Sequence, residues 1–556
     1  MPNEIRKCQN CKKEFVIEPD DFDFYKKMGV PAPVFCPDCR MKGKLVWRNE
    51  RTFYKRTCEL CKKSIITIYH PRYLAPIYCF DCWQSDKWDT FAYGVSHDST
   101  RPFFEQLGKL ILRVPKAATH IGTAGLRNIN SEYMNFAGGN KDCYLIFNST
   151  ENENCGHSRG IIKCKDTFDT YFANQTELCY EGINVNKSNK TLWGQNVSAC
   201  VNSYFLLNCV GLQNCFGCVN LRYKSYYFFN EPFSKDDWTK RVSEIFGSYQ
   251  EIEKARKRFK EFSLKFPKKE NNNLKTVNCT GDYITESKNC FDCFEAFGCE
   301  DCKYGFSIKL TKDSYDMVGR GVKSELLLET VAGGHNCSRI IGSWSTEASR
   351  NVEYSYDLRA CEDCFGCVGL KHAKYCILNK KYSEQEYKKI REQIINELKD
   401  KDLYGLYLPP ELSPWAYNET LAQEFFPLSK EETLAQGFRW EDEIFQTRGQ
   451  ETLKPDRIPD RIQDVSDSIL DKILVCVNCG RNYRLIKSEL EFYRKMLIPI
   501  PRKCFNCRHL ERVARRGPLK VYSRICQKCG KSIRTTFAPN RPEIVYCEEC
   551  YLKEVV

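Results

Sequence analysis

Residues 141–168, KDCYLIFNSTENENCGHSRGIIKCKDTF, repeat one short pattern every 12 positions. Cys143, Cys155 and Thr167 occupy the same place in successive repeats, and each of them follows an Asn or an Asp. Asn and Asp tolerate the left-handed backbone conformation that tight turns require. The runs between them, such as YLIF at 144–147, are rich in aromatic and β-branched residues, which favour strands. This stretch therefore predicts a short strand and a turn in every repeat.

The 12-residue step continues beyond this stretch, at Cys179, Thr191, Cys290, Cys302, Ser314 and Leu326. Twelve extended residues would span about 40 Å, so the chain must turn within each repeat. A parallel β-helix satisfies this requirement, with small side chains stacked inward about 4.8 Å apart. We therefore expect a mainly β protein whose centre is a Cys-rich, parallel β-helix-like solenoid.

The central region is itself duplicated. CFGCVNL at 215–221 returns as CFGCVGL at 364–370, which is 149 positions later. We therefore expect a solenoid in two halves, at residues 131–268 and 269–400.

Each half ends with a predicted helix. Ser234 and Ser383 each have an acidic residue three positions later, which is the pattern of a helix-capping box. We expect these helices to cap the two halves, because a covered end hides strand edges that could otherwise pair with another chain.

Both ends of the chain carry four Cys-x-x-Cys pairs, and the two sets match at a constant offset of 468 residues. One Cys-x-x-Cys turn offers two thiolates, and two turns complete the tetrahedral shell that Zn²⁺ favours. A shell of four thiolates leaves no open position, so each ion would be structural and not catalytic. We therefore predict four structural Zn²⁺ ions, bound by Cys8, Cys11, Cys36, Cys39, Cys58, Cys61, Cys79, Cys82, Cys476, Cys479, Cys504, Cys507, Cys526, Cys529, Cys547 and Cys550.

The alternatives to zinc binding are disulfides and free buried cysteines. The N-terminus has no apolar stretch after its first charges, so we expect a cytoplasmic protein in a reducing compartment, where disulfides are rare. Free buried cysteines do not explain a duplicated spacing. The pairing stays open at this point, because consecutive Cys pairs could share one ion or could be cross-braced.

The end copies resemble the probable zinc-ribbon or treble-clef domains of bacterial proteins. The motif residues of the first copy are the pair at 8–11, Phe15, Phe24, Tyr25, Pro33 and CPDCR at 36–40. The second copy keeps the pattern, with Tyr483 at the place of Phe15. The resemblance implies small α/β zinc modules that flank the solenoid, and it supplies no activity.

Three further helices are predicted outside the solenoid. Asp20 with Asp23, and Ser488 with Glu491, form capping-box-like pairs that begin a short helix in each end copy. Apolar residues recur at helical spacing over residues 100–114. The predicted segments are a double zinc module at 1–89, a helical connector at 90–130, the two solenoid halves, an extended connector at 401–471 and a second double zinc module at 472–556.

Eighteen of the 34 cysteines lie in the centre of the chain, and we expect them to be packed core residues. The alternative is a further metal site. Two Cys-x-x-Cys pairs are separated there by only five residues, at Cys290, Cys293, Cys299 and Cys302.

Positive charge is concentrated at the ends of the chain. Residues 1–89 hold 17 Lys and Arg against 12 Asp and Glu, and residues 472–556 hold 19 against 7. Basic side chains with a nearby aromatic ring could contact the phosphates and bases of RNA or another nucleic acid. The candidate contacts are Arg508, Arg512, Arg515, Arg516, Tyr522 and Arg524.

No catalytic constellation stands out. His157 and His335 lie beside solenoid positions and are expected to be packed or surface residues, and the glycine pairs 138–139 and 333–334 are expected in turns. No long apolar segment exists, so we expect no membrane span, and no small-molecule substrate is inferred. We predict a zinc-binding, non-enzymatic scaffold that binds nucleic acid, RNA being favoured. The alternative is a zinc-stabilised scaffold for a protein partner.

Overall fold

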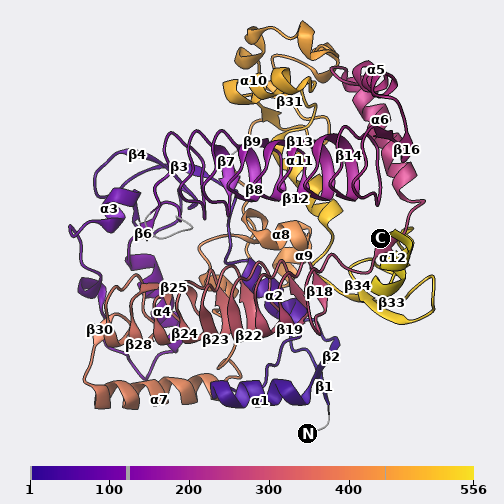
Figure 1. Cartoon of the computed structure of the whole chain (residues 1–556). Coiled ribbons are helices and arrows are strands. Elements are labelled where there is room, and N and C mark those ends of the chain that lie inside the picture. The colour runs from indigo at the N-terminus through magenta and orange to yellow at the C-terminus, as the bar shows by residue number, and fades with distance from the viewer. Residues whose placement is uncertain (1–2, 121–125, 445, 556) are drawn as a thin grey trace.

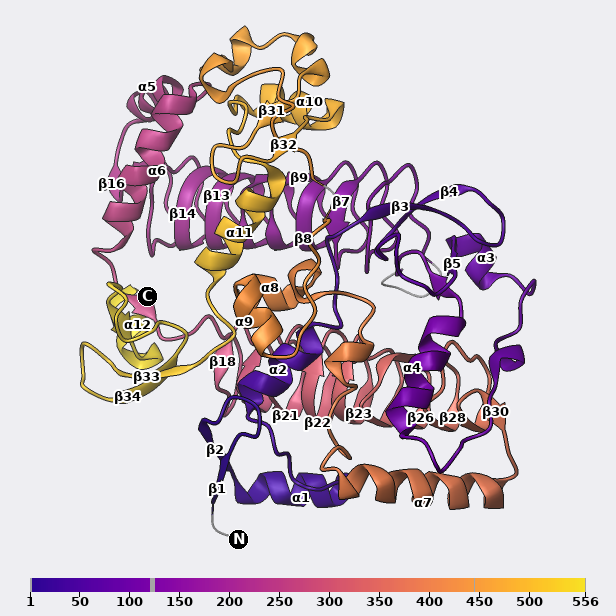
Figure 2. The same ribbon diagram turned by 180° about the vertical axis from the view of Figure 1, so that it is seen from behind.

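The structure is a computed structural model that describes residues 3–120, 126–444 and 446–555. Two rows of short parallel strands lie one above the other (Figure 1). We call them the first ladder, residues 129–228, and the second ladder, residues 274–377. Short helices lie between the ladders and around them (Figure 2). The predicted mainly β class is confirmed.

The register of the strands matches the repeat in the sequence. Cys179 pairs with Thr167, Cys290 with Cys302, and Cys364 with Cys376, each at a distance of 12 residues. The chain therefore returns beside itself once per repeat and adds one parallel layer each time. The 12-residue period is confirmed.

Six strands of the first ladder close into a ring of parallel neighbours. They are β8 (Gly156–Ile162), β9 (Lys165–Phe168), β10 (Tyr171–Asn174), β11 (Glu177–Tyr180), β12 (Ile183–Asn186) and β13 (Asn189–Ser198). The ring closes because β8 pairs with both β9 and β10, while β13 pairs with both β11 and β12. β7 (Tyr144–Phe147) and β14 (Val201–Val210) extend the ladder at its two ends.

The second ladder contains two steps of 13 residues. Tyr315 pairs with Leu328, and Leu328 pairs with Ile341. The extra residue moves Leu327 into the place predicted for Leu326, where its backbone N–H donates to Ser314 Oγ. The prediction of Leu326 was wrong because it assumed a constant step. The main strands are β19 (Lys288–Phe291), β21 (Glu300–Lys303), β22 (Thr311–Val318), β23 (Ser324–Val331), β24 (Ser338–Ile341), β25 (Trp344–Glu347), β26 (Arg350–Glu353), β27 (Tyr356–Arg359), β28 (Glu362–Phe365) and β29 (Lys374–Ile377).

Every repeat bends at residues in the left-handed conformation. In the first ladder the positive φ angles recur every third residue, at Asp142 (53°), Leu145 (52°), Asn148 (50°), Glu151 (57°) and Asn154 (49°). One 12-residue repeat therefore has four corners, more than the sequence indicated. A left-handed residue costs roughly 1–2 kcal/mol unless it is Gly, Asn or Asp, which explains why Asn and Asp recur at these corners.

Small side chains fill the interior of both ladders. Seventeen of the eighteen central cysteines are buried, Cys279 being the partly exposed one. Cys290, Cys293, Cys299 and Cys302 belong to one apolar core cluster, in which a thiol donates to a neighbouring backbone carbonyl. Across the described ranges, these four do not form a group that could hold an ion. The prediction of packed core cysteines is confirmed.

The two end copies are packed crosswise on the ladders. Helix α2 (Pro37–Leu45) of the N-terminal copy contacts β22 and β23 of the second ladder. Helix α11 (Phe505–Arg516) of the C-terminal copy contacts β8 and β10 of the first ladder. Each copy therefore lies against the ladder that is farther from it in the sequence.

Each end copy also pairs with the strand that precedes the other ladder in the sequence. β5 (Ile77–Tyr78) pairs with β6 (Lys116–Ala117), which precedes the first ladder. β35 (Val545–Tyr546) pairs with β17 (Lys268–Lys269), which precedes the second ladder. Glu50 of the N-terminal copy also pairs with Arg159 of the first ladder, and Arg516 of the C-terminal copy pairs with Glu295 of the second ladder, so both end copies bridge the two ladders.

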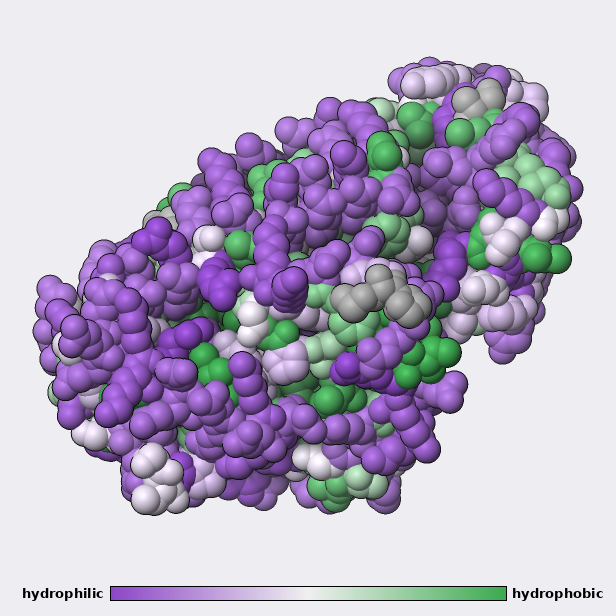
Figure 3. Space-filling model, turned by 90° about the horizontal axis from the view of Figure 1, so that it is seen from below, coloured by the Kyte–Doolittle hydropathy of each residue, from purple (hydrophilic) through white to green (hydrophobic). Residues whose placement is uncertain are grey.

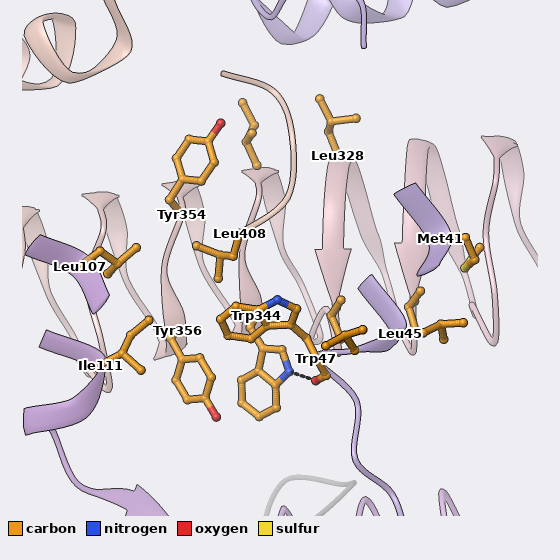
Figure 4. Packing of buried hydrophobic residues seen from close by; sticks show 14 of the residues in the cluster. Met41, Leu45, Trp47, Leu107, Ile111, Leu328, Trp344, Tyr354, Tyr356 and Leu408 are labelled. Carbon is orange, nitrogen blue, oxygen red and sulfur yellow. Dashed lines mark hydrogen bonds between the residues drawn. The ribbon is translucent and has the colours of Figure 1, made fainter. Parts of the chain in front are cut away.

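One large apolar core joins the N-terminal copy to the second ladder (Figure 4). Trp344 stacks on Tyr356 with 4.4 Å between ring centroids, and its indole N–H donates to the carbonyl of Trp47 over 2.8 Å. The predicted amphipathic helix at 100–114 is present as α4 (Phe103–Arg113), and its residues Leu107 and Ile111 enter this core. That prediction is confirmed.

Some predicted helix starts are correct and others are wrong. Ser234 and Ser383 cap α5 (Lys235–Ile245) and α7 (Glu384–Asp400), as expected. In contrast, α1 (Pro19–Met28) begins after Glu18, whose backbone N–H donates to the Asp21 carboxylate, so the expected pair of Asp20 with Asp23 is wrong.

Two further expectations about helices need correction. Helix α10 (Lys487–Met496) begins before Ser488, so Ser488 does not cap it. Helix α7 runs along the side of the second ladder and does not cover its end (Figure 1). The reason is its apolar stripe, which buries Tyr387, Ile394 and Leu398 along the length of the helix.

Candidate metal centres and a central cleft

The sixteen predicted zinc ligands assemble into four groups of four. In every group, all four Sγ atoms lie within 4.8 Å of one another. The groups are Cys8, Cys11, Cys36 and Cys39; Cys58, Cys61, Cys79 and Cys82; Cys476, Cys479, Cys504 and Cys507; and Cys526, Cys529, Cys547 and Cys550. Consecutive pairs therefore share one site, and the cross-braced alternative is wrong.

The distances between sulfurs fit a tetrahedral metal ion. One Sγ–Sγ distance in each group measures 3.6, 3.7, 3.8 or 3.8 Å. Zn–S bonds of about 2.3 Å place the corners of a tetrahedron about 3.8 Å apart, whereas a disulfide would need about 2.05 Å. All 34 cysteines are free thiols. The four groups could therefore hold four metal ions.

The turn that follows the second cysteine of each leading pair is the same in both copies. Lys12 (φ 62°) corresponds to Gly480 (φ 70°), and Lys62 (φ 63°) corresponds to Gly530 (φ 75°). A left-handed residue at this point folds the chain back beside the two sulfurs. Glycine reaches that conformation without steric cost, while the N-terminal copy places a lysine there.

Backbone N–H groups and asparagine side chains donate hydrogen bonds to the sulfurs. The backbone N–H of Cys36 donates to Cys8 Sγ over 3.3 Å, and the backbone N–H of Cys547 donates to Cys526 Sγ over 3.2 Å. The side chain of Asn10 donates to Cys39 Sγ over 3.5 Å, and its counterpart Asn478 makes the same bond over 3.4 Å in the other copy. Such donors stabilise negative charge on sulfur.

These hydrogen bonds alter the pKa of matching cysteines. Burial raises the pKa of Cys58, but backbone N–H groups, including that of Cys61, outweigh burial and bring this pKa to about 7. The counterpart Cys526 has the same balance, and its pKa is lowered to about 6. Both residues therefore lose their protons more readily than an ordinary cysteine, and the resulting thiolate is the form that binds a metal ion.

Three of the four arginines of α11, Arg508, Arg512 and Arg516, face inward. Arg508 Nη2 lies 3.0 Å from Asp169 Oδ2, and Arg512 Nη1 lies 3.0 Å from Asp169 Oδ1. Arg516 Nε lies 2.9 Å from Glu295 Oε1. Burial alone would raise the pKa of Asp169, but the guanidiniums of Arg508 and Arg512 hold it below its usual value.

Three of the predicted nucleic-acid contacts are therefore wrong. The exposed fractions of Arg508, Arg512 and Arg516 are 4%, 1% and 2%, and carboxylates of the ladders neutralise all three. Sequence reasoning assigned them to solvent because they are charged. Their spacing of four residues, which places them on one face of a helix, was the signal that was missed.

The other predicted contacts lie nearer the surface. Arg515 is exposed and donates to the carbonyl of Glu181 over 3.2 Å. Tyr522 and Arg524 are partly exposed, and Arg524 donates to the carbonyl of Ala538 over 3.3 Å.

The two histidines noted in the sequence occupy different environments. His157 is 4% exposed and stacks on Phe505, with Nε2 lying 3.4 Å from a carboxylate oxygen of Glu489. The expectation of a packed histidine is confirmed there. His335 lines a small hollow of about 260 Å³ beside the glycine pair 333–334.

A larger cleft of about 810 Å³ lies at the centre of the molecule. Its walls come from distant parts of the chain: residues 50–53, the first ladder, the segment around helix α8 (Leu421–Phe425), Arg481 and helix α11. Sequence reasoning missed this cleft because no local motif joins these segments.

Within the described ranges, no helix is both long and apolar enough to cross a membrane. No protein-family model matches the chain, and no curated protein shows a significant match. The resemblance to bacterial zinc-ribbon and treble-clef domains therefore remains a prediction, carried by the motifs of the end copies.

Proposed function

We propose that this chain is a non-enzymatic scaffold of the cytoplasm, locked in shape by four structural zinc ions. In this proposal the ladders are two halves of a parallel β-helix, and the end copies are modules of the treble-clef or zinc-ribbon kind. The main support is the crosswise packing, in which each end copy contacts both ladders: α2 and Glu50 of the N-terminal copy, and α11 with Arg516 of the C-terminal copy, make these contacts. Four metal-bound clamps would then hold one rigid body together.

Zinc is the metal that best suits the donor sets. Sites with four thiolates in a tetrahedron select Zn²⁺ over Mg²⁺ or Ca²⁺, which prefer oxygen ligands. A full shell leaves no position for an activated water, so the ions would serve folding. Binding of structural zinc is worth about 10–16 kcal/mol at pH 7, which is enough to fold a small module.

The scaffold would act on a protein partner in preference to RNA. The excess positive charge of the C-terminal copy favours RNA, yet three of its arginines are neutralised within the chain. On the face shown in Figure 3, hydrophilic residues dominate and hydrophobic residues gather only in small groups. Such a face is better suited to polar contacts with a partner than to a large apolar interface.

The first test is metal content and shape. Elemental mass spectrometry of the reduced, purified protein should find four zinc ions per chain. Removal of zinc by a strong chelator should expand the particle in small-angle X-ray scattering, because the clamps between the ladders open. Two or fewer zinc ions, or an unchanged scattering radius after complete removal, would overturn the proposal.

The second test separates the two kinds of partner. A fluorescence-anisotropy titration with a labelled RNA oligomer should show no binding tighter than micromolar near 50 mM salt. Tighter binding that weakens on charge reversal of Arg515 and Arg524 would restore the RNA hypothesis instead.

A further inference from the structure

The central cleft carries a row of aromatic rings along one wall. Phe53 packs edge-on against Tyr133 with 5.7 Å between centroids, and Tyr133 packs in the same way against Tyr144 at 5.5 Å. The row continues through His157 to Phe505 at 5.8 and 5.5 Å. Phe53, Tyr133, Tyr144 and Phe505 line the cleft and are only partly buried, so a flat ring in the cleft can pack against them.

Arg51 lines the same cleft and has an unused hydrogen-bond donor. Its side chain is 8% exposed, with Nε 3.8 Å from Glu424 Oε1 and Nη2 donating to Asn506 over 3.2 Å. No acceptor among the described residues reaches Nη1, which is buried. Burial lowers the pKa of Arg51 to about 10, because Glu424 compensates it only in part. A buried donor without a partner is uncommon in native proteins and suits an incoming acceptor.

Arg481 supplies a second such donor from the C-terminal copy. It lines the cleft, its Nε is buried, and within the described part of the chain this atom has no hydrogen-bond acceptor. No ion pair of Arg481 occurs among the described residues either. Guanidinium groups bind phosphate and carboxylate oxygens through charge-assisted hydrogen bonds.

The carboxylates around the cleft are already engaged. Glu50 lies 2.7 Å from Arg48 and 2.7 Å from Arg159, and Glu424 lies 3.0 Å from the ring nitrogen of His509. Glu419 accepts a hydrogen bond from Tyr54, and burial raises its pKa to about 7, so it is largely protonated below that pH. These groups therefore repel an incoming anion only weakly.

We propose that the central cleft binds a small ligand that combines a planar ring with an oxyanion, such as a nucleoside monophosphate. The ring would pack on Tyr133 and Tyr144, and the oxyanion would accept hydrogen bonds from Arg51 and Arg481. The volume of about 810 Å³ is in the range of small-molecule sites. This inference goes beyond the scaffold role and does not depend on it.

The test is isothermal titration calorimetry with the zinc-loaded, full-length protein. The probes are adenosine 5′-monophosphate, adenosine, inorganic phosphate and 4-hydroxybenzoate. We expect the monophosphate to bind with a Kd of about 1 mM or tighter, and adenosine and phosphate to bind at least about tenfold more weakly. If 4-hydroxybenzoate binds at least about tenfold more tightly than the monophosphate, the shared chemistry holds and the natural oxyanion is a carboxylate.

Variants of the two arginines decide whether the cleft is responsible. Arg481→Gln and Arg51→Gln should each weaken binding of the monophosphate by about tenfold, while Arg484→Gln, an exposed neighbour outside the cleft, should change it less than twofold. Zinc content and melting temperature confirm folding, and Arg481→Gln serves if Arg51→Gln does not fold.

Three results would overturn the proposal. The first is no binding of either ring-bearing anion at several millimolar. The second is binding that neither arginine variant changes. The third is binding of an RNA oligomer without any binding of the monophosphate. If the protein contains four zinc ions but binds none of the probes, this inference is wrong and the scaffold proposal is unaffected.

Discussion

Arg508 and Asp169 form a buried ion pair with 3.0 Å between Nη2 and Oδ2, although 339 positions separate them in the sequence. Arg40 and Asp316 form a matching pair, with 3.0 Å between Nε and Oδ1. Arg40 and Arg508 differ by the offset of 468 that relates the end copies. Counted back in repeats from the shared CFGC motif, Asp169 and Asp316 also occupy equivalent places. Each half of the protein is therefore one end copy together with the distant ladder.

Breaking this pair should be costly. Arg508→Ala leaves the buried carboxylates of Asp169 and Glu489 with less compensation, and loss of one partner of a buried pair costs about 3–5 kcal/mol. Urea unfolding should show a decrease of this size in the free energy of unfolding. Arg484→Ala, on the exposed surface of the same copy, is the control and should change it by less than about 0.5 kcal/mol. A loss below about 1 kcal/mol for Arg508→Ala would show that the pair is solvated.

The pH dependence of stability should reveal Glu419. Burial raises its pKa from 4.5 to about 7, so between these values the folded chain holds a proton that the unfolded chain has released. Its contribution to stability therefore falls as pH rises from about 4.5 to 7. In Glu419→Gln this loss is absent. The stability of the variant relative to the natural chain should thus increase by about 2 kcal/mol between pH 5.5 and pH 8, measured by chemical denaturation. A difference that stays constant with pH would contradict the raised pKa.

Loss of one metal site should spread beyond its own module. Cys504→Ser removes one of four ligands from a site that begins α11, the helix that buries its arginines against the first ladder. We expect elemental analysis to find three zinc ions, and limited proteolysis to cut both the C-terminal copy and the first ladder. Cys361→Ser is a matched control, because Cys361 is 2% exposed and belongs to no metal group among the described residues. It should keep four zinc ions, and cleavage confined to residues beyond 470 in Cys504→Ser would refute the coupling.

Sequence reasoning succeeded where one rule governs many positions. The 12-residue period predicted parallel layers, because every repeat places the same small residue beside its predecessor, as with Cys290 and Cys302. The spacing of Cys8, Cys11, Cys36 and Cys39 predicted a shared site, because two tight turns can bring four sulfurs together.

Sequence reasoning failed where a site is formed by surfaces that are distant in the sequence. The charge of Arg508 predicted a solvent-facing contact. The four-residue spacing of Arg508, Arg512 and Arg516 indicates one shared helix face, but the position of Asp169 on the first ladder is needed to show that this face points inward. Likewise, Arg51 and Arg481 come to line one cleft because both end copies fold onto the ladders. Such juxtapositions leave no local pattern in the sequence.

The crosswise arrangement predicts that substitutions in the two end copies loosen different ladders. Arg508→Ala with Arg512→Ala removes the cations that face the first ladder, while Arg40→Ala with Lys44→Ala removes those that face Asp316 and Glu329 of the second ladder. Each pair of substitutions leaves one set of buried carboxylates uncompensated, and local opening relieves this cost by hydrating them. Hydrogen exchange read by mass spectrometry should therefore speed up in residues 156–174 for the C-terminal variant and in residues 311–331 for the N-terminal variant. The two full-length proteins are each other's control. If both variants loosen the same ladder, or only the copy that carries the substitutions, the end copies do not clamp the ladders crosswise.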